Sequence, residues 1–178
     1  MSVGKARAIA VELVLWLLLA ASPGIAAGAS TQNHHPAAHS LLTSRNLWAT
    51  VDVCSPTDQP NTVGIRGSMP SDMHPKDEMF MRFQLQYLNV STKQWVDVGP
   101  SADSGFFKVG NASTVRQAGR TFELVPPSGT YTLRGYLEFQ WRRGAHVAHS
   151  VSRVTAAGHT SLAGADPPNY SAASCELK

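Results

Sequence analysis

The chain has 178 residues, a formal net charge of +3 and 15% charged residues. Its basic residues are scattered, with Arg142 and Arg143 as the one adjacent pair, so we do not expect the clustered basic surface that binds nucleic acid. Without residues 1–29, roughly 150 residues remain, which is enough for one domain with its own core and too few for two.

Residues 1–29 have the features of a secretory signal peptide. Lys5 and Arg7 precede a short apolar run, which small residues then follow. The run is shorter than the roughly 20 apolar residues that a membrane-spanning helix needs. We therefore predict cleavage before Ser30, with an end at Ala27 as the alternative, and a secreted protein without a membrane anchor.

Residues 30–46 are small and polar without a sustained period, and we predict that they form a flexible lead-in. The segment contains three histidines close together, His34, His35 and His39. Neutral imidazoles close in sequence can chelate copper or zinc. The alternative is a solvated segment without metal, because no rigid element orients the three rings.

From residue 47 onward the hydrophobic pattern has a period of two, which predicts β-strands. In 47–54, for example, Val51 and Val53 share one face, while Thr50 and Asp52 point to the other. The same alternation recurs in 61–69, 78–90, 94–99, 119–125, 130–141 and 146–155. Since no convincing helical period is present, we predict an all-β, antiparallel sandwich of about seven or eight strands over 47–178.

One stretch supports a more specific fold. The sequence FELVPPSGTYTLRGYLEF, at 122–139, resembles the E strand, turn and F strand of immunoglobulin-like and fibronectin type III-like sandwiches. The resemblance implies that Tyr131, near the start of the second strand, hydrogen-bonds back over the turn. The chain departs from antibody-type domains because its cysteines lie at the two ends of the domain and no tryptophan stands in the third strand. Such folds serve many roles, so the fold assigns no function.

Cys54 and Cys175 are the two cysteines of the chain. In an exported protein such a pair is expected to form a disulfide. The bond would tie the C-terminal tail to the start of the domain. Unpaired or metal-binding thiols are the alternative, although two cysteines so far apart lack the spacing of a zinc site.

A second set of possible metal ligands lies in the loop after 61–69. Met69, Met73 and His74 offer two thioethers and an imidazole, which are ligands that cuprous copper prefers. Met79 and Met81 fall on the apolar face of the next strand, where methionine is ordinary core filler. An exported copper-binding or other metal-binding protein is therefore the alternative function.

Aromatic and arginine residues indicate a possible partner-binding surface. Trp48 falls on the polar face of its strand, Trp95 opens a short strand beside a turn, and Arg142 and Arg143 occupy another turn. Exposed aromatic rings anchor protein partners or stack on sugars. The competing interpretation is that these tryptophans pack beneath a loop or the C-terminal tail.

The sequence contains no arrangement typical of catalysis. Asp72, Asp77 and Glu78 lie in one loop without an opposing partner, no serine has a nucleophile-elbow context, and both cysteines are committed to the disulfide. We therefore expect a non-catalytic, secreted binding module without a cofactor, whose partner is an extracellular protein or glycan.

Overall fold

The computed structural model describes residues 40–125 and 128–178. The predicted signal peptide and the histidines His34, His35 and His39 lie outside the described residues. Within the described ranges, no helix is both long enough and apolar enough to cross a membrane.

The described chain is built almost entirely of β-strands, as the alternating pattern predicts. The strands are β1 (Trp48–Cys54), β2 (Thr62–Met69), β3 (Glu78–Asn89), β4 (Gln94–Asp97), β5 (Phe107–Asn111), β6 (Arg116–Glu123), β7 (Tyr131–Arg143), β8 (His146–Val154) and β9 (Cys175–Leu177), with a 3-10 helix at Pro100–Ala102. The predicted all-β, antiparallel fold is confirmed, with β5 and β9 added to the predicted strands.

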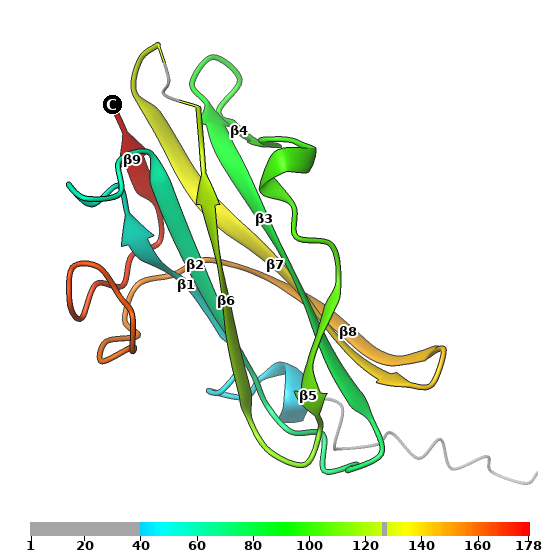
Figure 1. The fold of residues 1–178 in the computed structure, drawn as a ribbon. Helices are drawn as coiled ribbons and strands as arrows, with labels where there is room; N and C mark the ends of the chain where they lie inside the picture. Colours follow the sequence, from blue (N-terminus) through cyan, green and yellow to red (C-terminus); the bar gives the residue numbers. More distant parts are fainter. Residues whose placement is uncertain (1–39, 126–127) are drawn as a thin grey trace, which may run out of the picture. The chain divides into compact units, whose positions relative to one another are not determined.

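The strands form two antiparallel sheets (Figure 1). The first has the order β1-β2-β6, and the second has the order β4-β3-β7-β8, with β5 pairing with β3 and β9 with β7. β3 and β7 form the centre of the second sheet and pair along ten residues, from Glu78 opposite Arg142 to Tyr87 opposite Leu133. Any side chain on one of these two strands therefore has a fixed neighbour on the other.

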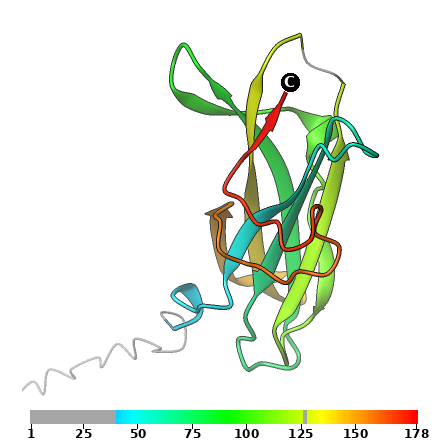
Figure 2. The same cartoon turned by 90° about the vertical axis from the view of Figure 1, so that its left-hand side faces the viewer.

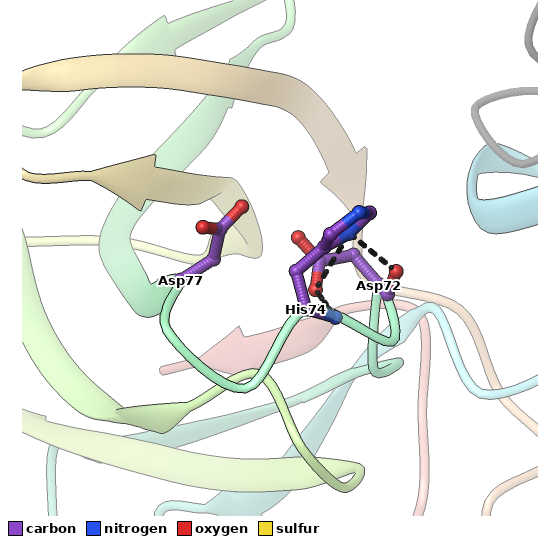
Figure 3. Close-up of side chains that lie close together, drawn as sticks. All are labelled: Asp72, His74 and Asp77. Atoms are coloured by element: carbon purple, nitrogen blue, oxygen red, sulfur yellow. Dashed lines mark hydrogen bonds and ion pairs between the residues drawn. The ribbon is translucent and has the colours of Figure 1, made fainter.

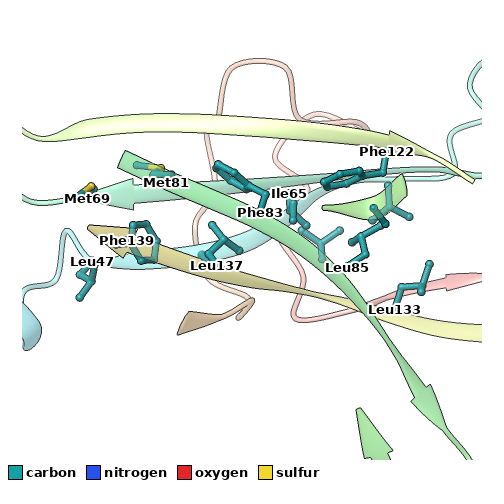
Figure 4. Packing of buried hydrophobic residues seen from close by; sticks show 14 of the residues in the cluster. Leu47, Ile65, Met69, Met81, Phe83, Leu85, Phe122, Leu133, Leu137 and Phe139 are labelled. Atoms are coloured by element: carbon teal, nitrogen blue, oxygen red, sulfur yellow. The ribbon is translucent and has the colours of Figure 1, made fainter. Parts of the chain in front are cut away.

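The core lies between the two sheets (Figure 4). Phe83 of β3, Phe139 and Trp141 of β7, and Ile65 of β2 are all fully buried there. Every second residue of β3 and β7 points into this core, and the residues between them point outward. The period of two in the sequence thus reflects a buried inner face and a more exposed outer face of the second sheet.

Residues 155–174, which we call the excursion, leave the second sheet after β8, run beside β1 and return as β9 (Figure 2). The backbone of Val51 exchanges two hydrogen bonds with Ala172, at 2.9 and 3.0 Å. Because the excursion covers the outer side of β1, Thr50 and Asp52 are buried, although the alternation predicts that they point away from the core. Arg66 pairs with the Asp52 carboxylate at 2.7 Å and satisfies its charge.

The predicted disulfide between Cys54 and Cys175 is confirmed. It joins the end of β1 to the start of β9, with 5.5 Å between the two Cα atoms, and closes a separation of 121 residues. Because β1 and β9 belong to different sheets, the bond links the two sheets and anchors the returning end of the excursion.

The structure differs from the predicted flexible lead-in at its C-terminal end. Residues 40–42 form a helical turn, and Leu41 is buried in the core cluster. The Arg153 guanidinium of β8 donates a 2.6 Å hydrogen bond to the Leu42 carbonyl. The apolar Leu41 side chain therefore gives this part of the lead-in a fixed place against the domain.

Candidate functional site

The outward side chains of β3 and β7 form one continuous surface, which we call the outer face. Because the two strands are antiparallel and in register, these side chains stand in cross-strand pairs. Trp95 of β4 extends the surface at one end, since it is opposite Leu88. The side chains of the outer face are half-buried and come from Phe80, Arg82, Gln84, Gln86, Arg134, Tyr136, Glu138, Gln140 and Arg142.

At the β4 end of the outer face, the Arg134 guanidinium stacks on the Trp95 ring, 4.3 Å from its centroid. Arg134 Nε donates a 3.0 Å hydrogen bond to Gln86 Oε1, and Gln86 Nε2 donates a 2.9 Å bond to Asp97 Oδ1. Arg134 is therefore connected to the Asp97 carboxylate only through the Gln86 side-chain amide. Burial lowers the pKa of Arg134, because no adjacent carboxylate compensates its charge.

At the opposite end, the Arg142 guanidinium lies between two aromatic rings. Its Cζ atom is 4.1 Å from the centroid of Phe80 and 4.9 Å from that of Phe106. Arg142 Nε donates a 2.8 Å hydrogen bond to Gln140 Oε1. The rings and the amide orient the guanidinium, but they leave its positive charge uncompensated.

At the centre of the outer face, by contrast with its ends, the arginine is paired with carboxylates. Arg82 binds Asp103 through two nitrogens and Glu138 through the third, at 2.9 Å. These contacts raise the pKa of Arg82, and the hydrogen bond from Arg82 lowers the pKa of Asp103. Within residues 40–125 and 128–178, by contrast, neither Arg134 nor Arg142 has an ion-pair partner. Two arginines without an ion pair thus flank a centre in which one guanidinium is shared by two carboxylates.

The structure brings together only some of the side chains proposed for partner binding. Trp95 and Arg142 lie on the outer face. Arg143 instead binds Asp77 through two hydrogen bonds of 2.6 and 2.9 Å. Trp48 stacks on His159 of the excursion, with ring centroids 4.2 Å apart, so the tail covers it.

Tyr131 does not make the contact that the resemblance implies within the described residues. Its side chain is 41% exposed, and its ring packs edge-on against Tyr87, with centroids 6.3 Å apart. No hydrogen bond of its hydroxyl to another described residue is present. The described part of the chain thus holds Tyr131 by ring packing.

The proposed copper ligands are separated. Met69 is completely buried in the core, whereas Met73 is 81% exposed at the tip of its loop. A single ion therefore cannot use both thioethers without moving Met69 out of the core. Met79 and Met81 are fully buried, as expected for core filler.

A different cluster forms in the loop at 70–77 (Figure 3). Ligand atoms of Asp72, His74 and Asp77 lie within 4.8 Å of one another. The loop is anchored at its base by the Trp141 indole, which donates a 3.0 Å hydrogen bond to the Pro70 carbonyl. The sequence shows the three residues in one loop, but only the fold reveals that two of their carboxylates are buried side by side.

The two carboxylates of this cluster have opposite environments. Burial raises the pKa of Asp72, and the nearby charge of Asp77 adds to the effect. Hydrogen bonds from Arg143 lower the pKa of Asp77. The side chains are only 3% and 1% exposed, respectively. One carboxylate is therefore compensated by a cation and its neighbour is not.

An apolar opening of about 600 Å³ lies elsewhere, where Tyr87, Leu124, Tyr131, Leu133 and Leu177 meet. Its lining also includes residues on both sides of 126–127, which are outside the described residues. The described lining is mainly apolar; its polar members besides the tyrosines are Ser101, Glu123 and Ser128, of which one is charged. We therefore place no site in this opening.

Comparisons with protein-family models, with curated proteins and with solved structures found no match. The outer face and the loop cluster are thus identified by their geometry and chemistry alone.

Proposed function

We propose that the protein is an exported, non-catalytic binding module of the immunoglobulin-like class that recognises an extracellular protein through its outer face. The disulfide and the predicted signal peptide support export, because such bonds persist in oxidising compartments. The two-sheet, antiparallel architecture supports the fold class.

One observation carries the proposal: Arg134 and Arg142 are each stacked on aromatic rings but have no carboxylate partner in the described chain. Holding a guanidinium in one orientation costs side-chain entropy. An ion pair commonly offsets this cost, but Arg134 and Arg142 have none within the described residues. A partner that supplies a carboxylate at each end would complete both sites.

The spacing of the two arginines adds a geometric condition. Eight positions separate Arg134 from Arg142 along β7, which at about 3.3 Å per residue is roughly 26 Å. A partner must therefore present two acidic groups at a similar distance. Between them, Arg82 is already paired with both Asp103 and Glu138, so the partner's acidic groups must lie at the two ends and not over this centre.

A protein partner is favoured over a glycan by the composition of the face. Aromatic residues and arginine are enriched in protein interfaces, and lysine and acidic residues are depleted at their centres. The two ends of the outer face follow the enrichment in aromatic residues and arginine, since Phe80, Phe106 and Trp95 lie beside the two arginines that have no ion pair. The centre, with Glu138 and Asp103, does not follow the depletion of acidic residues.

The proposal is tested by cross-linking the protein in the extracellular fraction of its natural host and identifying cross-linked peptides by mass spectrometry. We expect cross-links to a defined acidic protein, centred on β3, β4 and β7. They should be lost in the double variant R134A/R142A and weakened by high salt. Arg45→Ala, which changes an exposed arginine before β1, should leave them intact.

Two results would refute the proposal. Cross-links that persist in R134A/R142A would place the interface elsewhere. Binding of the purified protein to isolated host polysaccharide, lost in the same double variant, would assign the outer face to a glycan instead of a protein.

A further inference from the structure

The cluster at 70–77 contains a buried polar atom that the fold does not satisfy. Asp72 Oδ1 accepts a 2.8 Å hydrogen bond from the His74 backbone N–H, but Asp72 Oδ2 is buried without any hydrogen-bond partner. Figure 3 shows the Asp72 carboxylate turned toward Asp77. A buried carboxylate oxygen that faces a second carboxylate is unfavourable unless a cation or a proton lies between them.

The charges of the surrounding groups are not balanced. Arg143 donates one hydrogen bond to each oxygen of Asp77. Lys76 belongs to the same loop but has no ion pair within the described residues. Two carboxylates thus share one guanidinium, and the ring beside Asp72 is that of His74, whose Nδ1 lies 3.8 Å from Asp72 Oδ1.

We propose that Asp72, His74 and Asp77 form a binding site for a divalent transition-metal cation of the zinc class. Two carboxylates and an imidazole are a donor set that suits zinc, and three protein ligands leave a position for water. His74 Nδ1 lies 2.9 Å from the Asp72 carbonyl oxygen. Metal-binding histidines typically donate one ring N–H to such an acceptor, which leaves the second nitrogen for the metal.

Small movements complete the site. With either ring nitrogen of His74 counted, one ligand atom from each residue lies within 4.8 Å of the others, whereas ligands of a tetrahedral zinc ion are roughly 3.4 Å apart, given bonds of about 2.1 Å. The His74 side chain is 56% exposed and is oriented by the contact of Nδ1 with the Asp72 carbonyl, so small shifts of the loop at 70–77 must bring the three ligands closer together. An open pocket of about 440 Å³, which His74 and Asp77 help to line, gives a cation access from solvent.

Arg143 competes with the metal for Asp77. Its guanidinium occupies both oxygens of Asp77, but its side chain is 60% exposed and can move into solvent. Cation binding at Asp77 therefore requires Arg143 to give up at least one of its hydrogen bonds. Removing the guanidinium should then strengthen metal binding.

The test is isothermal titration calorimetry with zinc chloride on the full chain, with its disulfide formed. His34, His35 and His39 are replaced by alanine so that the lead-in contributes no imidazole. We expect one zinc ion per chain. Affinity should fall at least tenfold in D72N and H74A, rise several-fold in R143Q, and remain unchanged in D58N, which alters an exposed turn carboxylate.

A stability measurement separates metal binding from misfolding. In zinc-free buffer, Asp72→Asn should fold and melt at the same or a higher temperature, because its amide can donate to Asp77 where the carboxylate cannot. Added zinc should raise the melting temperature of the parent protein but not of D72N. Absence of stoichiometric zinc uptake, or equal affinity in the parent and D72N, would overturn the proposal.

Discussion

Gly135 of β7 is tightly packed between Thr155, which follows β8, and Ile65 of β2 in the other sheet. A Cβ atom at this position would lie 2.7 Å from Thr155 Cγ2 and 2.9 Å from Ile65 Cγ2. Both neighbours carry β-branched side chains with little freedom to move away. The glycine is therefore required for packing, since its backbone is an ordinary strand.

We predict that Gly135→Ala destabilises the protein by about 1–3 kcal/mol through overpacking. Urea denaturation measures the change in the free energy of unfolding. Gly129→Ala, at an exposed position with no heavy atom within 4 Å of the new Cβ, is the matched control and should remain within about 0.5 kcal/mol of the parent. Equal stabilities for the two variants would contradict the close approach at Gly135.

His159 gives the excursion a dependence on pH. It stacks on Trp48, and burial lowers its pKa below the ordinary value of 6.5. The unfolded chain therefore takes up a proton near pH 6.5, while the native state still resists protonation. The resulting stability is fully present above pH 6.5 and is lost as the pH falls through the pKa of folded His159.

We predict that His159→Phe, which keeps a ring on Trp48 but cannot titrate, loses less stability than the parent between pH 7.5 and pH 5.5. Thermal unfolding at the two pH values measures the difference. The other histidines are common to both proteins, so their contributions cancel in the comparison. If both proteins lose the same stability between pH 7.5 and pH 5.5, protonation of His159 does not contribute to the pH dependence.

Among the elements, the excursion depends on one threonine. Thr155 is buried, and its hydroxyl accepts a 3.0 Å hydrogen bond from the Gly135 N–H of β7. The same hydroxyl donates a 2.6 Å bond to the Ala173 carbonyl. Thr155 thus links the end of β8, the centre of β7 and the return of the excursion.

We predict that Thr155→Val, which retains the shape but not the hydroxyl, costs about 1–3 kcal/mol because the Gly135 N–H and the Ala173 carbonyl lose their partner. Thr155→Ser keeps the hydroxyl and should cost less. Urea denaturation of the two variants and the parent measures the change in the free energy of unfolding. A serine variant as unstable as the valine variant would show that the methyl group, and not the hydrogen bonds, holds the excursion.

The elements that could be predicted from sequence are those with a long, regular period. β3 and β7 alternate over most of their length, and their inner residues are buried as expected. β9 is too short and β5 too irregular for a period to appear. Burial of Thr50 and Asp52 could not be predicted, because it depends on the excursion far along the chain. The cluster of Asp72 with Asp77 was missed for a related reason: their burial comes from the fold and not from the loop sequence.

At the scale of the whole molecule, the disulfide couples the two sheets. Cys54 ends β1 in the first sheet, and Cys175 begins β9 in the second. Away from this bond, the excursion is held to β1 mainly by backbone hydrogen bonds, such as those between Val51 and Ala172. The disulfide therefore limits how far the excursion can separate from the sheets when these bonds open.

We predict that replacing both cysteines with alanine lowers the free energy of unfolding by about 2–5 kcal/mol, since the unfolded chain regains the entropy of a long open loop. Hydrogen exchange should accelerate first at Val51 and Ala172, while amides that bond across the β3–β7 ladder stay protected, because this ladder does not depend on the excursion. If exchange instead accelerates equally in β3 and β7, the excursion and the sheets open as one unit. The disulfide would then stabilise the whole fold without a distinct role at the edge of β1.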